Sequence, residues 1–100
     1  MFLIVRLWLR NECDVGEFEE YEREVAQVMQ AHGGRIERAF RVEEGRYEEE
    51  PFEVHVLWFP DEAAFSAYRN DARVVALREK RDTLIKRTEI WRGNEVNYGF

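Results

Sequence analysis

Two similar stretches, FLIVRLWL at residues 2–9 and FEVHVLWF at residues 52–59, decide the fold of this chain of 100 residues. Each is an apolar run of strand length that ends in a polar break. An amphipathic helical segment and a second strand follow each run, at residues 14–32 and 35–42 in the first half and at residues 61–81 and 85–92 in the second. The sequence therefore reads strand, helix, strand twice.

The order βαββαβ predicts an α+β domain, a ferredoxin-like sandwich with its helices on one face of a four-stranded sheet. We expect an antiparallel sheet of order 4-1-3-2, although the two central strands, the first and the third, are expected to run parallel to each other. The charge-rich segments 35–42 and 85–92 suit the sheet edges. Residues 1–93 are expected to form this single domain, and residues 94–100 a C-terminal tail.

Local signals mark the ends of the helices. Asp14 followed by Glu17 has the spacing of a capping box, and the pair Gly33-Gly34 suits a helix C-terminus. Asp61 is expected to cap the second helical segment, which is predicted to break at Asn70-Asp71. Residues three and four apart form the predicted inner face of the first helix, namely Phe18, Tyr21, Val25, Val28 and Met29. Its predicted solvent side is formed by Glu19, Glu20, Glu22, Arg23 and Glu24.

The period of two along the central strands separates the two faces of the sheet. We assign the purely apolar sets to the face under the helices, namely Leu3, Val5, Leu7 and Leu9 with Val54, Val56 and Trp58. The opposite face would then carry Phe2, Ile4, Trp8, Leu57 and Phe59 among Arg6, Arg10 and His55. That face is too apolar for water, so the sequence predicts a homodimer in which two copies pack their sheets face to face.

The pocket between these two sheets is the candidate site. His55 is the candidate catalytic acid or base, because its unperturbed pKa lies near neutrality. Arg6 or Arg38 could hold an anionic group beside it, and Arg6, Trp8, Arg38, Leu57 and Phe59 are the candidate ligand-binding residues. The alternative is a packed histidine bonded across the dimer, with arginines that form ion pairs to Glu53 and Glu89.

The composition disfavours two classes of protein, those that bind nucleic acids and those that span a membrane. Lys and Arg number 15 against 21 Asp and Glu, a net charge of −6, which disfavours nucleic-acid binding. No apolar run is long enough to span a membrane, and a single cysteine, Cys13, with no export signal favours a cytoplasmic protein. The Glu-rich segment 43–51 is expected to be a solvated loop. No CxxC pair or cluster of histidines is present, so we predict no metal and no cofactor.

The layout resembles the dimeric α/β-barrel superfamily, and its short motifs look most like the DUF1330 group. These motifs are HGGR at residues 32–35, FPDEAAF at residues 59–65, the segment 70–81 that ends in Arg81, and Gly93. The resemblance implies a homodimeric barrel related to antibiotic-biosynthesis monooxygenases, which oxidise substrates without a cofactor. Heme-degrading relatives carry a histidine on the second helix, and this chain has none between Asp61 and Arg81.

Two hypotheses follow for the function. The favoured one is a homodimeric module that binds a small apolar or anionic ligand or is purely structural. The other is a cofactor-independent monooxygenase or isomerase-like enzyme, in which His55 is the acid or base. A cavity of several hundred cubic ångströms lined by His55 and arginines would favour a ligand site, whereas a filled interior would favour a structural dimer.

Overall fold

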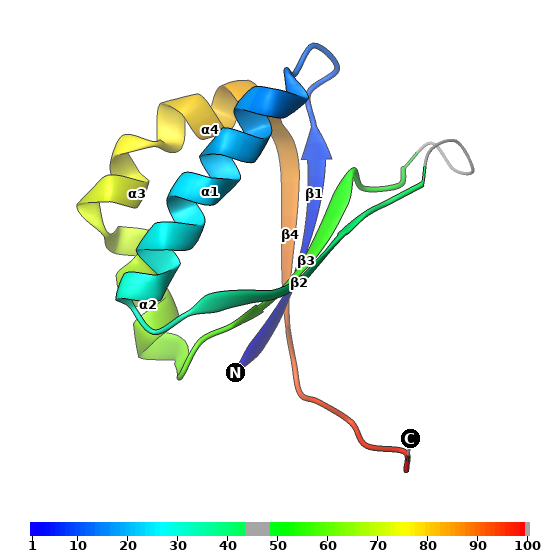
Figure 1. Cartoon of the computed structure of the whole chain (residues 1–100), viewed down its shortest axis with the longest axis vertical. Coiled ribbons are helices and arrows are strands. Elements are labelled where there is room, and N and C mark those ends of the chain that lie inside the picture. The colour runs from blue at the N-terminus through cyan, green and yellow to red at the C-terminus, as the bar shows by residue number, and fades with distance from the viewer. Residues whose placement is uncertain (44–48, 100) are drawn as a thin grey trace.

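The computed structural model describes residues 1–43 and 49–99 and shows helices on one side of a single sheet (Figure 1). Most of the predicted acidic loop, at residues 44–48, and Phe100 lie outside the described residues. The elements in chain order are β1 (Phe2–Leu9), α1 (Val15–Ala31), β2 (Arg35–Arg41), β3 (Glu53–Trp58), α2 (Glu62–Asn70), α3 (Ala72–Ala76), α4 (Arg78–Leu84) and β4 (Ile85–Gly93).

The helix ends lie where the capping residues predict. The side chains of Asp14 and Asp61 accept hydrogen bonds from backbone N–H groups in the first turns of α1 and α2. Asp71 breaks the second helical segment as expected and caps α3 through the N–H of Arg73. A further break at Leu77, which the sequence did not predict, separates α3 from α4.

The sheet has the order β2-β3-β1-β4, as predicted, and every neighbouring pair is antiparallel. The prediction that β1 and β3 run parallel is therefore wrong. The helix after β1 returns the chain, so β2 runs in the same direction as β1, and the β2–β3 connection then reverses it. Val5 pairs with His55 and Leu3 with Leu57, which fixes these four residues on one face of the sheet.

The core lies between this face and the helices. Leu3 and Phe18 are fully buried, and Phe59 is fully buried against the rings of Phe65 and Tyr68. A Cβ on Gly34 would lie 2.3 Å from the Phe59 ring, so glycine is required for this close approach. Gly33 has a φ of +74°, the left-handed conformation expected after the end of α1.

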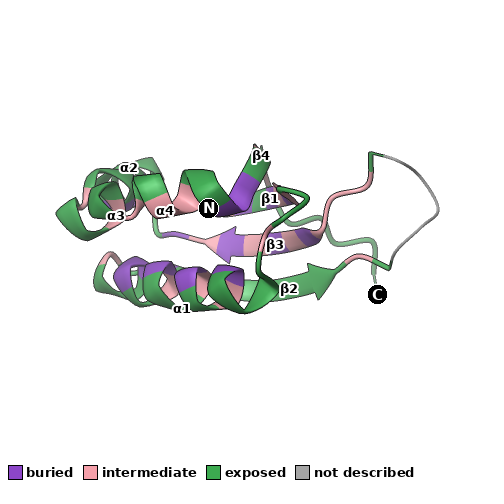
Figure 2. Ribbon diagram, turned by 90° about the horizontal axis from the view of Figure 1, so that it is seen from above, coloured by how far each residue is buried: buried purple, intermediate pink, exposed green. Residues whose placement is uncertain are grey.

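The predicted faces are correct for β1 and wrong for β3. Glu53, His55, Leu57 and Phe59 are buried under the helices, and the apolar set that we placed there lies on the other face. Figure 2 shows the alternation of buried and intermediate residues along β3. Antiparallel pairing with β1 determines which residues of β3 lie under the helices, because it brings His55 beside the buried Val5 rather than beside Ile4.

The uncovered side of the sheet, hereafter the open face, retains large apolar side chains. Ile4, Phe40 and Trp91 are exposed, and between 36% and 55% of their surfaces are accessible. The register places Ile4 between Val56 and Trp91, so these residues form one row across three strands. The open face is therefore apolar at its centre, as predicted, although its members from β3 are the opposite set.

No helix among residues 1–43 and 49–99 is both long and apolar enough to cross a lipid bilayer. The strand β4 ends at Gly93, and the chain beyond it leads away from the sheet (Figure 1). Val96 and Tyr98 are exposed on this segment.

Candidate active site

A cavity of about 360 Å³ lies between the helices and the covered face of the sheet. Its floor comes from β1, β3 and β4, and its walls come from α1 on one side and from α2, α3 and α4 on the other. In Figure 2, α1 and the three short helices form two separate rows, and the buried side of α1 is turned toward the other row. The polar part of the lining is formed by Tyr21, Glu22, His55, Tyr68, Arg69, Arg78, Arg81, Asp82 and Thr88. A cavity of this volume suits a small organic molecule.

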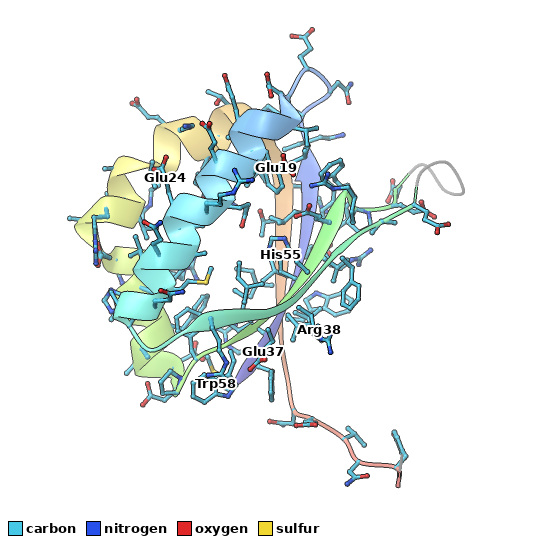
Figure 3. The ribbon with its side chains drawn as sticks, viewed as in Figure 1. Glu19, Glu24, Glu37, Arg38, His55 and Trp58 are labelled. Atoms are coloured by element: carbon cyan, nitrogen blue, oxygen red, sulfur yellow. The ribbon has the colours of Figure 1, made fainter. Side chains whose placement is uncertain are left out.

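His55 lines this cavity from β3 and is 4% exposed. Figure 3 shows His55 on the helix side of the sheet, whereas Arg38 lies on the opposite side. The predicted pocket between two sheets therefore does not contain His55. The reason is the face of β3, which places its polar residues under the helices.

A row of charged groups fixes the histidine ring. The Nε2 atom of His55 lies 2.7 Å from a carboxylate oxygen of Glu53. Glu53 is also buried, and its other oxygen accepts two hydrogen bonds from Arg41, at 2.6 and 3.1 Å. Since a carboxylate held by arginine only accepts, Nε2 carries the proton in this bond. The Nδ1 atom is then the nitrogen that is free to exchange a proton.

Glu22 on α1 provides a carboxyl group beside the histidine ring. One of its carboxylate oxygens lies 3.7 Å from Nδ1 of His55, and its side chain is 16% exposed. Burial raises the pKa of Glu22 to about 7, and the negative charge of Glu53 also raises it, while His55 and Arg81 lower it. Near neutral pH the Glu22 carboxyl group is therefore divided between its acid and its base form.

Two phenols complete the polar wall. Burial raises the pKa of Tyr21 to about 12 and raises that of Tyr68 further. Both groups therefore keep their protons at neutral pH and can donate hydrogen bonds to an oxygen in the cavity. A carboxyl group that titrates near neutrality, an oriented imidazole and two neutral phenols form a constellation suited to moving a proton on a bound molecule.

The predicted site residues divide between the two faces. His55 and Leu57 line the cavity, and Phe59 is buried under the helices. Arg6, Trp8 and Arg38 lie on strand positions that face the open side. These three therefore do not join His55 in one site, because the β-sheet itself separates them.

The alternative interpretation, that the arginines on the strands form ion pairs with Glu53 and Glu89, is confirmed for Arg6. Its guanidinium lies 3.0 Å from the carboxylate of Glu89, and it stacks on the rings of Trp8 and Trp91. Arg87 pairs with the same carboxylate and lies over Trp8. Glu53 has an arginine partner as well, although that partner is Arg41. Ion pairs and stacking on indole rings thus account for the arginines at the centre of the open face.

Sequence reasoning missed Glu22, which we had assigned to the solvent side of α1. A signal was present, because Glu22 follows Phe18 by four residues and precedes Val25 by three, which places it on the inner face of the helix. An acidic residue on an otherwise apolar helix face is a candidate functional group. Glu53 was treated as a partner for arginine, although it lies two residues before His55 and therefore on the same face of β3, where the two side chains bond.

Among residues 1–43 and 49–99, no group of three His, Cys, Asp or Glu side chains could hold a metal ion. The other histidine, His32, follows α1, and its Nε2 atom lies 2.9 Å from the carboxylate of Asp71. The ring thus joins the end of α1 to the capping residue of α3. His32 is also the C-cap residue of α1, and its backbone N–H donates a hydrogen bond of 2.9 Å to the carbonyl oxygen of Met29.

Comparisons with solved structures support the fold. The chain is similar to a protein of unknown function from Rhodopseudomonas palustris, with a TM-score of 0.82 and 17% identity over 96% of this chain and 82% of that one. It is also similar to a dabb family protein with a ferredoxin-like fold from Mesorhizobium loti, with a TM-score of 0.66 and 15% identity over 96% of each chain.

An antibiotic biosynthesis monooxygenase has a TM-score of 0.66 and 13% identity, over 96% of this chain and 98% of that one. A comparison with curated proteins gave no match. The model of the domain of unknown function DUF1330 matches residues 2–91, which is nearly the whole folded chain. The chain therefore belongs to the DUF1330 family.

Proposed function

We propose that this protein binds a small organic molecule in the cavity beneath its helices and transfers a proton on it. The observation that carries this proposal is the placement of the buried Glu22 carboxyl group, 3.7 Å from Nδ1 of His55, at the wall of the cavity. The second ring nitrogen is held by Glu53, so the ring cannot turn away. Buried titratable groups in a cavity, oriented by further hydrogen bonds, are typical of acid–base catalysis.

The reaction class that this arrangement supports is proton abstraction from carbon next to a carbonyl group. Glu22 as carboxylate takes the proton, the C–H electron pair forms a carbon–carbon double bond, and the π pair of the carbonyl group moves onto its oxygen. The phenols of Tyr21 and Tyr68 can donate hydrogen bonds to this oxygen as its charge develops. In a substrate whose next carbon–carbon bond is a double bond, the enolate is conjugated, and return of the proton from Glu22 or His55 to its far carbon completes an isomerisation that needs no cofactor.

A monooxygenase would need molecular oxygen in addition to this proton transfer. The fold resemblance to a protein described as an antibiotic biosynthesis monooxygenase makes this the second candidate. The two candidates differ in stoichiometry, because an isomerase consumes no oxygen. Once a carbonyl compound that serves as a substrate is found, oxygen consumption measured with an oxygen electrode distinguishes the isomerase from the monooxygenase.

The base can be tested without the natural substrate by using the elimination of 5-nitrobenzisoxazole. In this reaction a base removes the proton on C3, the C–H electron pair forms the nitrile, and the N–O bond breaks to leave a coloured phenolate. We expect the protein to catalyse it, with a rate that rises with pH through an apparent pKa near 7 because Glu22 must be ionised. Glu22→Gln should lower the rate by about a hundredfold, the usual contribution of a general base.

The matched control is Glu24→Gln. Glu24 is exposed on the same helix and lies outside the cavity lining, so its loss should leave the rate unchanged (Figure 3). A wild-type rate equal to that of Glu22→Gln would contradict the assignment of the base. Tight binding of small molecules with no turnover would instead identify a binding module.

The open face supports a second proposal, that two copies of the chain associate through their sheets. Ile4, Phe40 and Trp91 are large, exposed and grouped on this face. Exposed apolar groups of this kind on a small protein are typical of an interface, and a second copy presents a self-complementary surface across a two-fold axis. The cavity is lined by one chain alone, so this association would leave it intact.

A further inference from the structure

Three arginines gather at the helical rim of the cavity in a chain whose net charge is −6. Arg69 comes from α2, and Arg78 and Arg81 come from α4. The carboxyl groups in the same lining are those of Glu22 and Asp82. Asp82 is 72% exposed and lies 3.6 Å from Arg81. The rim is therefore positive in an otherwise acidic molecule.

Two of these arginines have no carboxylate partner within the described part of the chain. The Arg69 guanidinium lies over the Phe65 ring, and Arg78 donates a hydrogen bond of 3.3 Å to the backbone carbonyl of Arg69. Elsewhere the usual arrangement is an ion pair, as for Arg92 with Glu62. Within the described residues Arg69 and Arg78 thus form no ion pair, although the charge of Arg69 contributes to lowering the pKa of Glu62.

Arg81 extends the positive charge from the rim toward the floor of the cavity. It donates a hydrogen bond of 2.6 Å to the hydroxyl oxygen of Thr88 on the cavity floor. Its charge also lowers the pKa values of Glu22 and Tyr21, so its field reaches the proton-transfer groups. The rest of the lining is mostly apolar, with Val25, Met29 and Leu57 among its members.

We propose that the molecule bound in this cavity is a small organic carboxylate, held by its charged group at Arg69, Arg78 and Arg81 and by its apolar body against Leu57 and Phe65. A guanidinium binds a carboxylate through two parallel hydrogen bonds, and an arginine without another partner pays no cost of breaking an ion pair. The ligand's apolar body then reaches the Glu22 and His55 end of the same cavity. This inference rests on one part of the proposed function, namely that the cavity beneath the helices binds a small organic molecule.

The test compares 2-naphthoate with 2-naphthamide, which has the same apolar body and no charge, by isothermal titration calorimetry. We expect the wild-type protein to bind the carboxylate at least about tenfold more tightly, as charge-assisted bonds to arginine imply. The double variant Arg69→Gln/Arg78→Gln should lose this preference and keep its affinity for the amide. Arg23→Gln/Arg38→Gln is the matched control, since both arginines are exposed and outside the lining, and it should keep the preference.

Equal binding of the two probes by the wild-type protein, or no binding of 2-naphthoate, would overturn the proposal. An unchanged preference in the Arg69→Gln/Arg78→Gln variant would also overturn it. These failures are separable from failure of the proposed function. Elimination of 5-nitrobenzisoxazole without a preference for 2-naphthoate would refute only the carboxylate, whereas the preference without elimination would refute only the proton transfer.

Discussion

The two faces of this sheet carry similar residue types and use them differently. On the covered face, the polar side chains of Glu53 and His55 are buried and bonded to each other. On the open face, Arg6 lies flat against Trp8 and Trp91 and remains about one-third exposed. Burial under the helices raises the pKa of Glu22 over the covered face, which is where we propose the proton transfer takes place. The open face, with its exposed indole and aliphatic groups, is suited to association.

The largest expected difference between the faces is in stability, and adjacent residues of the chain test it. Phe59→Ala should lower the free energy of unfolding by about 4 kcal/mol, because it opens a cavity in the fully buried cluster with Phe65 and Tyr68. Trp58→Ala should cost about 1 kcal/mol in dilute solution, because Trp58 lies on the open face under the guanidinium of Arg35. Urea denaturation measures both, and equal losses would show that the faces are wrongly assigned.

A second comparison concerns Glu53 on the covered face and Glu89 on the open face, because each carboxylate contacts two basic side chains. Glu53→Gln should cost about 3 kcal/mol, because it leaves Arg41 and the buried His55 without their shared carboxylate. Glu89→Gln, on the open face, should cost less than about 1 kcal/mol, because Arg6 and Arg87 can turn to water. Thermal unfolding of the two variants in parallel gives the difference, and a larger loss for Glu89→Gln would reverse the comparison.

Association should depend on the open face alone. Trp8→Glu places a negative charge among the aromatic side chains of this face, so we expect the dissociation constant of the dimer to rise about a hundredfold, or roughly 3 kcal/mol. Analytical ultracentrifugation at micromolar concentration measures this change. Glu24→Arg on α1 is the control and should leave association unchanged. A wild-type protein that is monomeric at this concentration would refute the dimer.

The smallest expected effect is a pH dependence of the free energy of unfolding, which we attribute to Glu22 over the covered face. The pKa of Glu22 is about 7 in the folded protein and 4.5 without the fold, so the folded state holds this proton more tightly. Stability from this group is complete below pH 4.5 and is lost as pH rises toward 7, and we expect a fall of about 2 kcal/mol. Denaturation between pH 5 and pH 8 should show the fall in wild-type protein and in Glu24→Gln. The Glu22→Gln variant should not show it.

Much of the fold follows from local rules that the sequence displays. The caps at Asp14, Asp61 and Asp71 act through short-range hydrogen bonds, so their positions predict the helix starts. The face of β3 does not follow from its own pattern, because both alternate sets of its residues are compatible with burial. The partner strand decides, and a pairing of Val5 with His55 is a long-range fact that local periodicity does not contain.

The candidate site was recognised only in part for the same reason. His55 was identified by its chemistry, since the chain has only two histidines and an imidazole group can act as an acid or a base. Its partners Glu22 and Glu53 were not identified, although the spacing of Glu22 on the inner face of α1 and of Glu53 two residues before His55 pointed to them, because the chain has many other acidic residues. Arg6 and Arg38 were grouped with His55 because one face was misassigned, and that single error moved the whole predicted pocket to the other side of the sheet.

The wall opposite α1 is made of three short helices rather than one long helix, with joints at Asp71 and Leu77. A residue inserted or deleted at either joint would alter how far Val74 or Arg78 reaches over the floor while leaving every strand pairing untouched. A change of length at a joint would therefore alter the volume and the charge of the cavity without changing the sheet beneath it.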